Sequence, residues 1–182
     1  GPRGGGGRER TLRAARSIGA MVTGVLPDPA PVDPDGGPLT DPQAVVEAFL
    51  HALAASDVEG AAALLADDVR YVNVGLPTVR GRARVAKVLG GLAKPSTSFE
   101  VYLHAISADG PVVLTERTDV LVFGSLRAQF WVCGRFDVRD GRIELWRDSF
   151  DFVDITRAFL RGLAGMVLPG VRPPAPSSAD DP

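Results

Sequence analysis

Three charged side chains stand in predicted strands at positions where burial is expected. Arg117 and Asp119 are two residues apart in the strand-like run 111–123, and Asp148 lies in the run 142–153. Two carboxyl groups beside one guanidinium carry a net negative charge, and an apolar surrounding favours uptake of one proton. Such a pair supplies one protonated acid and one ionised base, as general acid–base catalysis requires.

The hairpin that follows determines where Arg117 and Asp119 point. A two-residue turn at Gly124-Ser125 pairs Asp119 with Phe130 and Arg117 with Val132. Paired residues share a face of the sheet, and this face of the run 126–138 is consistently apolar. Its members are Leu126, Ala128, Phe130, Val132, Gly134, Phe136 and Val138. The two charged side chains are therefore predicted to project onto the most apolar face of the sheet.

The register of Asp148 depends on the next turn. A two-residue turn at Asp140-Gly141 would pair Asp148 with Cys133, on the opposite face of the sheet. A three-residue loop over 139–141 with a glycine bulge would pair Asp148 with Val132 instead. This loop also turns three aromatic side chains inward, namely Trp146, Phe150 and Phe152. We favour the three-residue loop because it buries these aromatic residues.

A shorter predicted strand, 69–74, carries Tyr71 and Asn73 on one face. Asn73 is the only asparagine of the chain, and Tyr71 is one of two tyrosines. Phenol and amide groups can both hold a water molecule. Taken alone, these two residues are typical of an ordinary strand, and a buried Asp–Arg–Asp cluster also occurs as a structural ion network. Spacing alone leaves the catalytic and the structural interpretation open.

Helices and strands are expected in a fixed order around these residues. Asp41 and Pro42 begin a helix, and the capping pattern from Ser56 to Glu59 begins a second one that runs to Leu65. The remaining predicted elements are a helix over 81–93, strands over 98–107, 111–123, 126–138 and 142–153, and a helix over 154–167. Helices followed by antiparallel strands predict an α+β fold, with the sheet curved around the helices and a pocket inside.

Two further groups of residues lie outside this apolar face, and we interpret both as structural. The last predicted helix carries Ile155, Phe159, Leu163 and Met166 on one side, which is typical of core or of a pocket lid. Trp131 and Cys133 lie on the other face of the sheet from Phe130. We expect Trp131 to serve packing or a subunit contact and Cys133 to be a packed, unreactive thiol.

Length and composition limit the class of protein. A chain of 182 residues with one cysteine and two histidines is too poor in ligands for a cysteine- or histidine-based metal centre. Twenty basic residues against 22 acidic ones argue against nucleic-acid binding. No apolar run reaches the ~18 residues of a membrane span, and no clear signal-peptide cleavage site is present, so we expect a cytoplasmic protein.

The distribution of glycine and proline predicts three regions. Residues 1–40 contain nine Gly and six Pro and are predicted to be a largely disordered extension. Residues 41–168 form the single compact domain, and the proline-rich segment 169–182 forms a tail.

Three short motifs resemble the signatures of limonene-1,2-epoxide hydrolases, in the same order and at similar separations. They are Tyr71-Val72-Asn73, the run from Glu116 to Leu121, and the run from Trp146 to Asp151. The resemblance covers residues 41–167, and the stretch around Trp131 is most similar to the mycobacterial branch. It implies the cone-shaped fold shared with nuclear transport factor 2, ketosteroid isomerase and polyketide cyclases. In that fold a strongly curved, antiparallel or mixed sheet wraps around N-terminal helices, with a C-terminal helix added.

The resemblance also implies roles for the candidate residues. Asp119 becomes the general acid on the epoxide oxygen, and Asp148 the general base on a water that Tyr71 and Asn73 also hold. Arg117 bridges the two carboxyl groups. The substrate is expected to be an apolar epoxide, the product a vicinal diol, and the assembly a homodimer without metal or cofactor. The expected substrate-binding residues are Phe130, Val132, Trp146 and Phe150.

Ser149 departs from the family pattern, which usually has tyrosine there. Because this residue neighbours Asp148 but points to the other face of the strand, we expect altered support of the base with activity retained.

Two other functions fit the same residues less well. An isomerase or cyclase on this fold needs one base and an oxyanion donor, so the Arg-bridged pair of aspartates argues against it. A non-catalytic binding module would use the Asp–Arg network structurally and would have a filled cone. The apolar face around Phe130 and Val132, together with Tyr71 and Asn73, favours an open site.

Overall fold

The computed structural model describes residues 39–92, 96–168 and 170. The helices are α2 (Pro42–Ala54), α3 (Val58–Ala63), α4 (Arg82–Leu92) and α5 (Phe152–Val167). The strands are β1 (Leu65–Asn73), β2 (Val79–Arg80), β3 (Thr97–Asp109), β4 (Val112–Phe123), β5 (Leu126–Arg139) and β6 (Arg142–Ser149). The predicted extension up to residue 38 and the tail over 169–182, apart from Gly170, lie outside the described residues.

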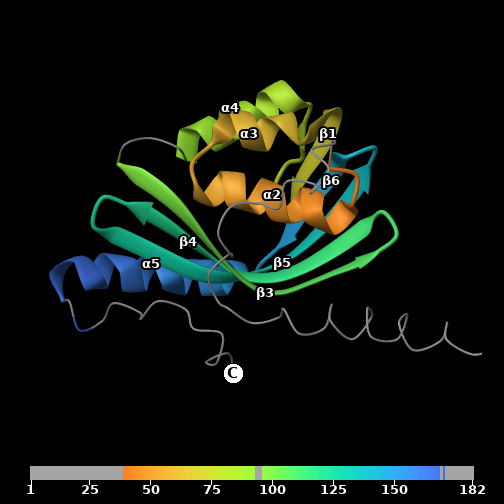
Figure 1. The fold of residues 1–182 in the computed structure, drawn as a ribbon. Coiled ribbons are helices and arrows are strands. Elements are labelled where there is room, and N and C mark those ends of the chain that lie inside the picture. Colours follow the sequence, from red (N-terminus) through yellow and green to blue (C-terminus); the bar gives the residue numbers. More distant parts are fainter. Residues whose placement is uncertain (1–38, 93–95, 169, 171–182) are drawn as a thin grey trace, which may run out of the picture.

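One strongly curved sheet holds all six strands, in the order β2-β1-β6-β5-β4-β3. Neighbouring strands are antiparallel except β1 and β6, which are parallel, so the sheet is mixed. Helices α2, α3 and α4 lie on its concave side, and α5 runs along the strands next to β5 (Figure 1). The predicted α+β cone with a C-terminal helix is confirmed.

Helix α2 begins where the sequence predicts. The Asp41 side chain accepts a hydrogen bond from the Ala44 amide at 2.9 Å, and Pro42 needs no amide partner at the first turn. The apolar face of α2 is buried in the main core and consists of Val45, Val46, Phe49, Leu50 and Leu53. This face anchors the main core inside the cone.

Helix α3 is shorter than predicted, and β1 begins earlier. Asp57, rather than Ser56, caps α3 by accepting from the Gly60 amide at 2.8 Å. The helix ends at Ala63 because Leu65 already pairs with Ile143 of β6, and both side chains are fully buried. Pairing between such distant segments overrides the local helical pattern.

The predicted register between β4 and β5 is confirmed. Asp119 pairs with Phe130 and Arg117 with Val132, through a tight turn in which Gly124 has a φ of 60°. Glycine adopts this left-handed conformation without steric cost.

The predicted register between β5 and β6 is wrong by two residues, although the predicted face is right. Asp148 pairs with Gly134, not with Val132. The turn is the two-residue one, with Arg139 opposite Arg142, and the ladder then shifts between Asp137 and Val138. The shift lets Ile143 and Trp146 both enter the main core although they are three residues apart.

The final strand also ends earlier than predicted. Strand β6 stops at Ser149, and α5 begins at Phe152 because the Asp151 side chain accepts from the Val153 amide at 2.7 Å. Phe152 therefore opens the helix and is 47% exposed, so the expectation that it turns inward is wrong. Trp146, in contrast, is buried as predicted.

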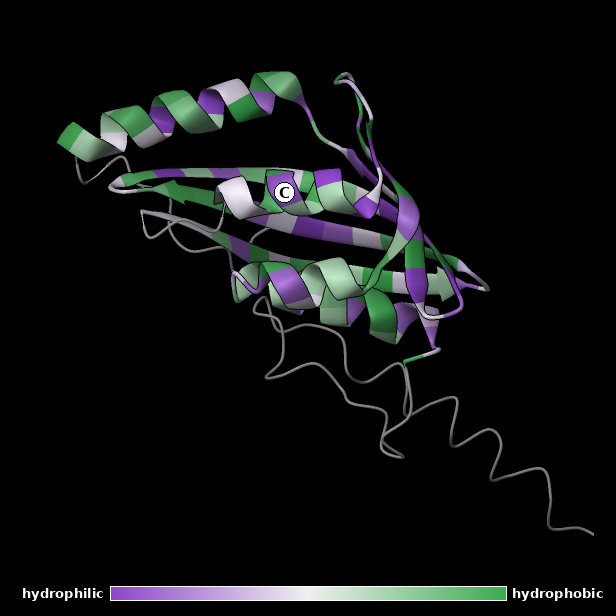
Figure 2. Ribbon diagram, turned by 90° about the horizontal axis from the view of Figure 1, so that it is seen from above, coloured by the Kyte–Doolittle hydropathy of each residue, from purple (hydrophilic) through white to green (hydrophobic). Residues whose placement is uncertain are grey.

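Helix α5 approaches β5 closely because its buried residues are small: Ala158, Gly162 and Gly165. A Cβ atom at Gly162 would stand 2.6 Å from the Arg127 carbonyl oxygen. Hydrophobic residues run along the whole helix (Figure 2). Of the predicted stripe, Ile155 and Phe159 pack toward β5, whereas Leu163 and Met166 are exposed.

Candidate active site

Arg117, Asp119 and Asp148 form one buried cluster. Their exposed fractions are 1%, 4% and 4%. Arg117 donates from Nε to Asp119 Oδ1 at 2.9 Å and from Nη2 to Asp119 Oδ2 at 3.3 Å. The same Nη2 lies 2.7 Å from Asp148 Oδ2. One guanidinium thus holds two carboxyl groups side by side, as the sequence analysis expected.

The sheet topology explains how the cluster assembles. Arg117 and Asp119 come from β4, Asp148 comes from β6, and β5 runs between these two strands. The side chain of Arg117 must therefore cross over β5 to reach Asp148.

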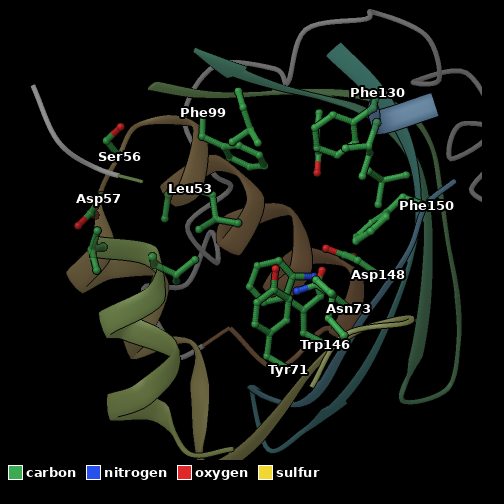
Figure 3. Close-up of a pocket in the computed structure, with 18 of the residues that line it drawn as sticks. Leu53, Ser56, Asp57, Tyr71, Asn73, Phe99, Phe130, Trp146, Asp148 and Phe150 are labelled. Atoms are coloured by element: carbon green, nitrogen blue, oxygen red, sulfur yellow. The ribbon is translucent and has the colours of Figure 1, made fainter. Parts of the chain in front are cut away.

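Tyr71 and Asn73 join the cluster from β1. The parallel pairing of β1 with β6 places Asn73 beside Asp148 and Tyr71 beside Trp146. The Tyr71 and Trp146 rings stack with centroids 3.9 Å apart. Tyr71, Asn73, Trp146 and Asp148 gather at one part of the cavity wall (Figure 3). All five predicted catalytic residues are thus brought together in the structure.

Burial sets the protonation of the cluster. Desolvation raises the pKa of Asp119 to about 6, and Asp148 adds to the rise, while Arg117 opposes it. Burial would lower the pKa of Arg117, but Asp119 and Asp148 raise it overall, so the guanidinium stays charged. Burial, with the charge of Asp148, also raises the pKa of Tyr71, which keeps its proton. Asp119 is therefore suited to be the proton donor.

Two buried polar atoms at the site have no protein hydrogen-bond partner among the described residues. They are Asp148 Oδ1 and Trp146 Nε1. A buried carboxylate oxygen without a donor is costly unless another molecule supplies one. Water or a ligand oxygen could meet both atoms, since Asp148 and Trp146 both line the cavity.

The cavity has a volume of about 230 Å³ and lies between the two hydrophobic clusters of the fold. All four predicted substrate-binding residues line it, namely Phe130, Val132, Trp146 and Phe150. Ser56 and Asp57 lie across the cavity from Asp148 and Asn73 (Figure 3). An open cavity differs from the filled cone that a binding module would have.

Sequence reasoning missed much of the cavity wall. The additional apolar lining residues are Ala52, Leu53, Val58, Leu76, Leu89, Phe99, Leu121, Ile155 and Phe159. Ile155 and Phe159 could have been identified from the sequence, because they lie on the apolar stripe of the last predicted helix, which is typical of core or of a pocket lid.

Within the described part of the chain, no group of three or more His, Cys, Asp or Glu side chains is placed to hold a metal ion. No helix among the described residues has the length and apolar character to cross a membrane.

Fold and site together define a cone-shaped protein of the nuclear transport factor 2-like class, with two buried carboxyl groups held by one guanidinium. The sequence matches the limonene-1,2-epoxide hydrolase catalytic domain over residues 40–161. The chain belongs to the limonene-1,2-epoxide hydrolase family. Epoxide hydrolysis is the activity that this membership supports.

Individual relatives agree with this assignment. The chain is 51% identical to the epoxide hydrolase EphG of Mycobacterium tuberculosis over 127 residues, which cover 70% of this chain and 85% of EphG. A solved structure of a limonene-1,2-epoxide hydrolase-like epoxide hydrolase from M. tuberculosis superposes with a TM-score of 0.70 and 48% identity. The match covers 74% of this chain and 95% of the chain in the M. tuberculosis structure.

A more distant structure shares the fold alone. A protein with a ketosteroid isomerase-like fold from Catenulispora acidiphila superposes with a TM-score of 0.57 at 15% identity. The match covers 63% of this chain and 91% of that chain.

Proposed function

We propose that the protein hydrolyses an apolar epoxide to a vicinal diol in one acid–base step. Asp119 is the general acid, Asp148 is the general base, and Arg117 holds both carboxyl groups in place. Tyr71 and Asn73 help Asp148 to hold the attacking water. The observation that carries the proposal is the buried pair of carboxyl groups on one guanidinium, with Asp148 Oδ1 lacking a protein partner among the described residues.

The bond changes balance within this set of groups. Asp148 accepts a proton from water as the water oxygen bonds to an epoxide carbon. The carbon–oxygen bond breaks, and Asp119 donates its proton to the leaving oxygen. Each proton transfer can contribute about 10²–10⁴-fold in rate. Asp119 ends ionised and Asp148 ends protonated, and proton exchange with solvent restores both groups.

The reaction as written needs no further group. The two carboxyl groups and one water supply every proton and the nucleophile, so we propose an enzyme that works without metal or cofactor. The apolar wall formed by residues such as Phe130, Phe150 and Phe159 favours an apolar substrate.

Assembly as a homodimer is also part of the proposal. The outer face of the sheet carries Trp131, which is 42% exposed, and also the exposed residues Cys133 and Leu114. The expectation that Cys133 is packed within the chain is therefore wrong. Trp131 donates from Nε1 to Glu116 at 3.2 Å, which fixes its ring on this face. Exposed aromatic and aliphatic side chains of this kind are typical of subunit contacts.

We further propose that residues 41–168 are the complete catalytic unit, with residues 1–40 and 169–182 as an extension and a tail, and that the enzyme works in the cytoplasm. A chain shortened to 41–168 should keep the kcat/KM of the full chain.

The first experiment measures diol formation from limonene-1,2-epoxide and from a panel of bulkier apolar epoxides. Wild type should turn over at least one of them. Asp119→Asn keeps the size of the side chain but cannot donate the acid proton, so its kcat should fall by about 10²–10⁴-fold. Asp109→Asn, a change in the exposed end of β3, is the matched control and should keep wild-type turnover. A folded wild type that opens no epoxide would refute the proposal.

A further inference from the structure

The guanidinium of Arg117 reaches its two partners by lying across β5. Thr115 on β4, Gly134 on β5 and Asp148 on β6 stand side by side in the sheet, because Thr115 pairs with Gly134 and Gly134 pairs with Asp148. Arg117 is two residues from Thr115 and shares its face. The row from Thr115 to Asp148 is therefore the surface that the guanidinium covers.

Thr115 holds the end of the guanidinium that faces away from the carboxyl groups. Arg117 Nη1 donates to Thr115 Oγ1 at 3.1 Å, and the Thr115 side chain is itself almost fully buried. Nε and Nη2 are occupied by Asp119 and Asp148. The hydroxyl group thus fixes the rotation of the planar group about its long axis, since a guanidinium has donors at fixed angles.

Gly134 leaves the space that the guanidinium fills. A Cβ atom at this position would overlap both Arg117 Nη1 and Thr115 Oγ1, and would stand 3.1 Å from the Phe136 ring. Gly134 does not adopt a left-handed φ. Its lack of a side chain therefore serves close approach and not backbone conformation.

We infer that Thr115 and Gly134 are positioning residues, which hold the Arg117 guanidinium in the place where it contacts Asp119 and Asp148 at once. Neither residue lines the cavity, and neither touches the reacting atoms. They act on the reaction through Arg117. The catalytic consequence rests on the proposed function, whereas the positioning itself does not.

Substitutions at Thr115 separate positioning from simple packing. Thr115→Val keeps the branched shape but removes the acceptor, so Arg117 should move and kcat should fall about tenfold, with a smaller change in KM. Thr115→Ser restores a hydroxyl group and should recover most of kcat. Thr118→Val is the matched control, because Thr118 is also buried on β4 but bonds His104 at 2.8 Å on the other face. This control should lose stability without losing kcat.

A titration of the Asp119 carboxyl by ¹³C NMR gives a readout that needs no substrate. The charge of Arg117 lowers the pKa of Asp119, so a displaced guanidinium should let this pKa rise in Thr115→Val and leave it unchanged in Thr118→Val. An unshifted titration together with wild-type kcat in Thr115→Val would overturn the inference. Equal effects of Thr115→Val and Thr118→Val would overturn it as well.

A crystal structure of Gly134→Ala tests the second residue. The added methyl group should separate Arg117 Nη2 from Asp148 Oδ2 beyond about 4 Å, the limit of an ion pair. An intact contact would contradict the role of Gly134. If wild type opened no epoxide, the proposed function would fail, while the titration and this distance would still decide the positioning claim.

Discussion

At the scale of single residues, the chemistry depends on an unequal pair of carboxyl groups. Asp119 and Asp148 share Arg117, and the pKa of Asp119 is raised to about 6, mainly by desolvation. Below about pH 6 Asp119 therefore carries the proton, and Asp148 offers an oxygen that no described protein group occupies. Two identical side chains obtain different roles from their surroundings.

This inequality predicts the pH dependence of turnover. Asp119 must be protonated to act as the acid, so kcat/KM should fall as the pH rises through about 6. The measurement is kcat/KM for epoxide opening from pH 5 to pH 9. A profile that stays flat across this range would contradict the assignment of Asp119 as the acid.

At the scale of elements, some placements could be predicted from the sequence and others could not. The two-residue turn at Gly124-Ser125 is a local signal that determines the pairing of β4 with β5, so the sequence predicts the apolar face for Asp119 and Arg117 correctly. The register shift in β6 has no local turn signal and shows only in the spacing of Ile143 and Trp146. The parallel pairing that sets Asn73 beside Asp148 joins segments far apart in sequence, which no local pattern specifies.

Helix α5 supplies a test at this scale. Asp151 caps the helix that brings Ile155 and Phe159 to the cavity. Asp151→Ala should cost about 1 kcal/mol of stability and loosen this wall, raising KM several-fold with little change in kcat. Asp41→Ala removes the corresponding cap of α2. It should cost a similar free energy of unfolding without the change in KM, and equal effects on KM would argue against a role of α5 in substrate binding.

At the scale of the whole molecule, the raised pKa of Asp119 makes stability depend on pH. The pKa of Asp119 rises from 3.8 to about 6 on folding. Below the lower value, Asp119 is protonated in both states and contributes nothing. Between the two values, the folded state retains a proton that the unfolded state has released, so the free energy of unfolding falls as pH rises. Above about pH 6 the full cost is present, about 3 kcal/mol.

Denaturant unfolding of wild type and Asp119→Asn at pH 4 and pH 7 measures this cost. Relative to the variant, wild type should lose about 2 kcal/mol between the two pH values, because at pH 4 a small part of the cost is already present. At pH 7 the variant should be at least as stable as wild type. A variant that is strongly destabilised at pH 7 would indicate a structural ion network instead of a catalytic pair.

The outer face of the sheet bears on assembly at the same scale. If Trp131 and its exposed neighbours form the subunit contact, wild type should sediment as a dimer. Trp131→Glu places a charge on that face and should shift the population to monomers. Wild type that sediments as a monomer at micromolar concentration would exclude the proposed homodimer.

The central claim is direct attack by a water that Asp148 activates, and a single turnover in H₂¹⁸O tests it. Enzyme in excess over an apolar epoxide that wild type turns over is mixed in labelled water, and the diol is analysed by mass spectrometry. Direct attack predicts one ¹⁸O atom in the diol from the first turnover. An unlabelled diol in that turnover would mean that a carboxylate oxygen of the protein attacked the epoxide, and would contradict the one-step mechanism.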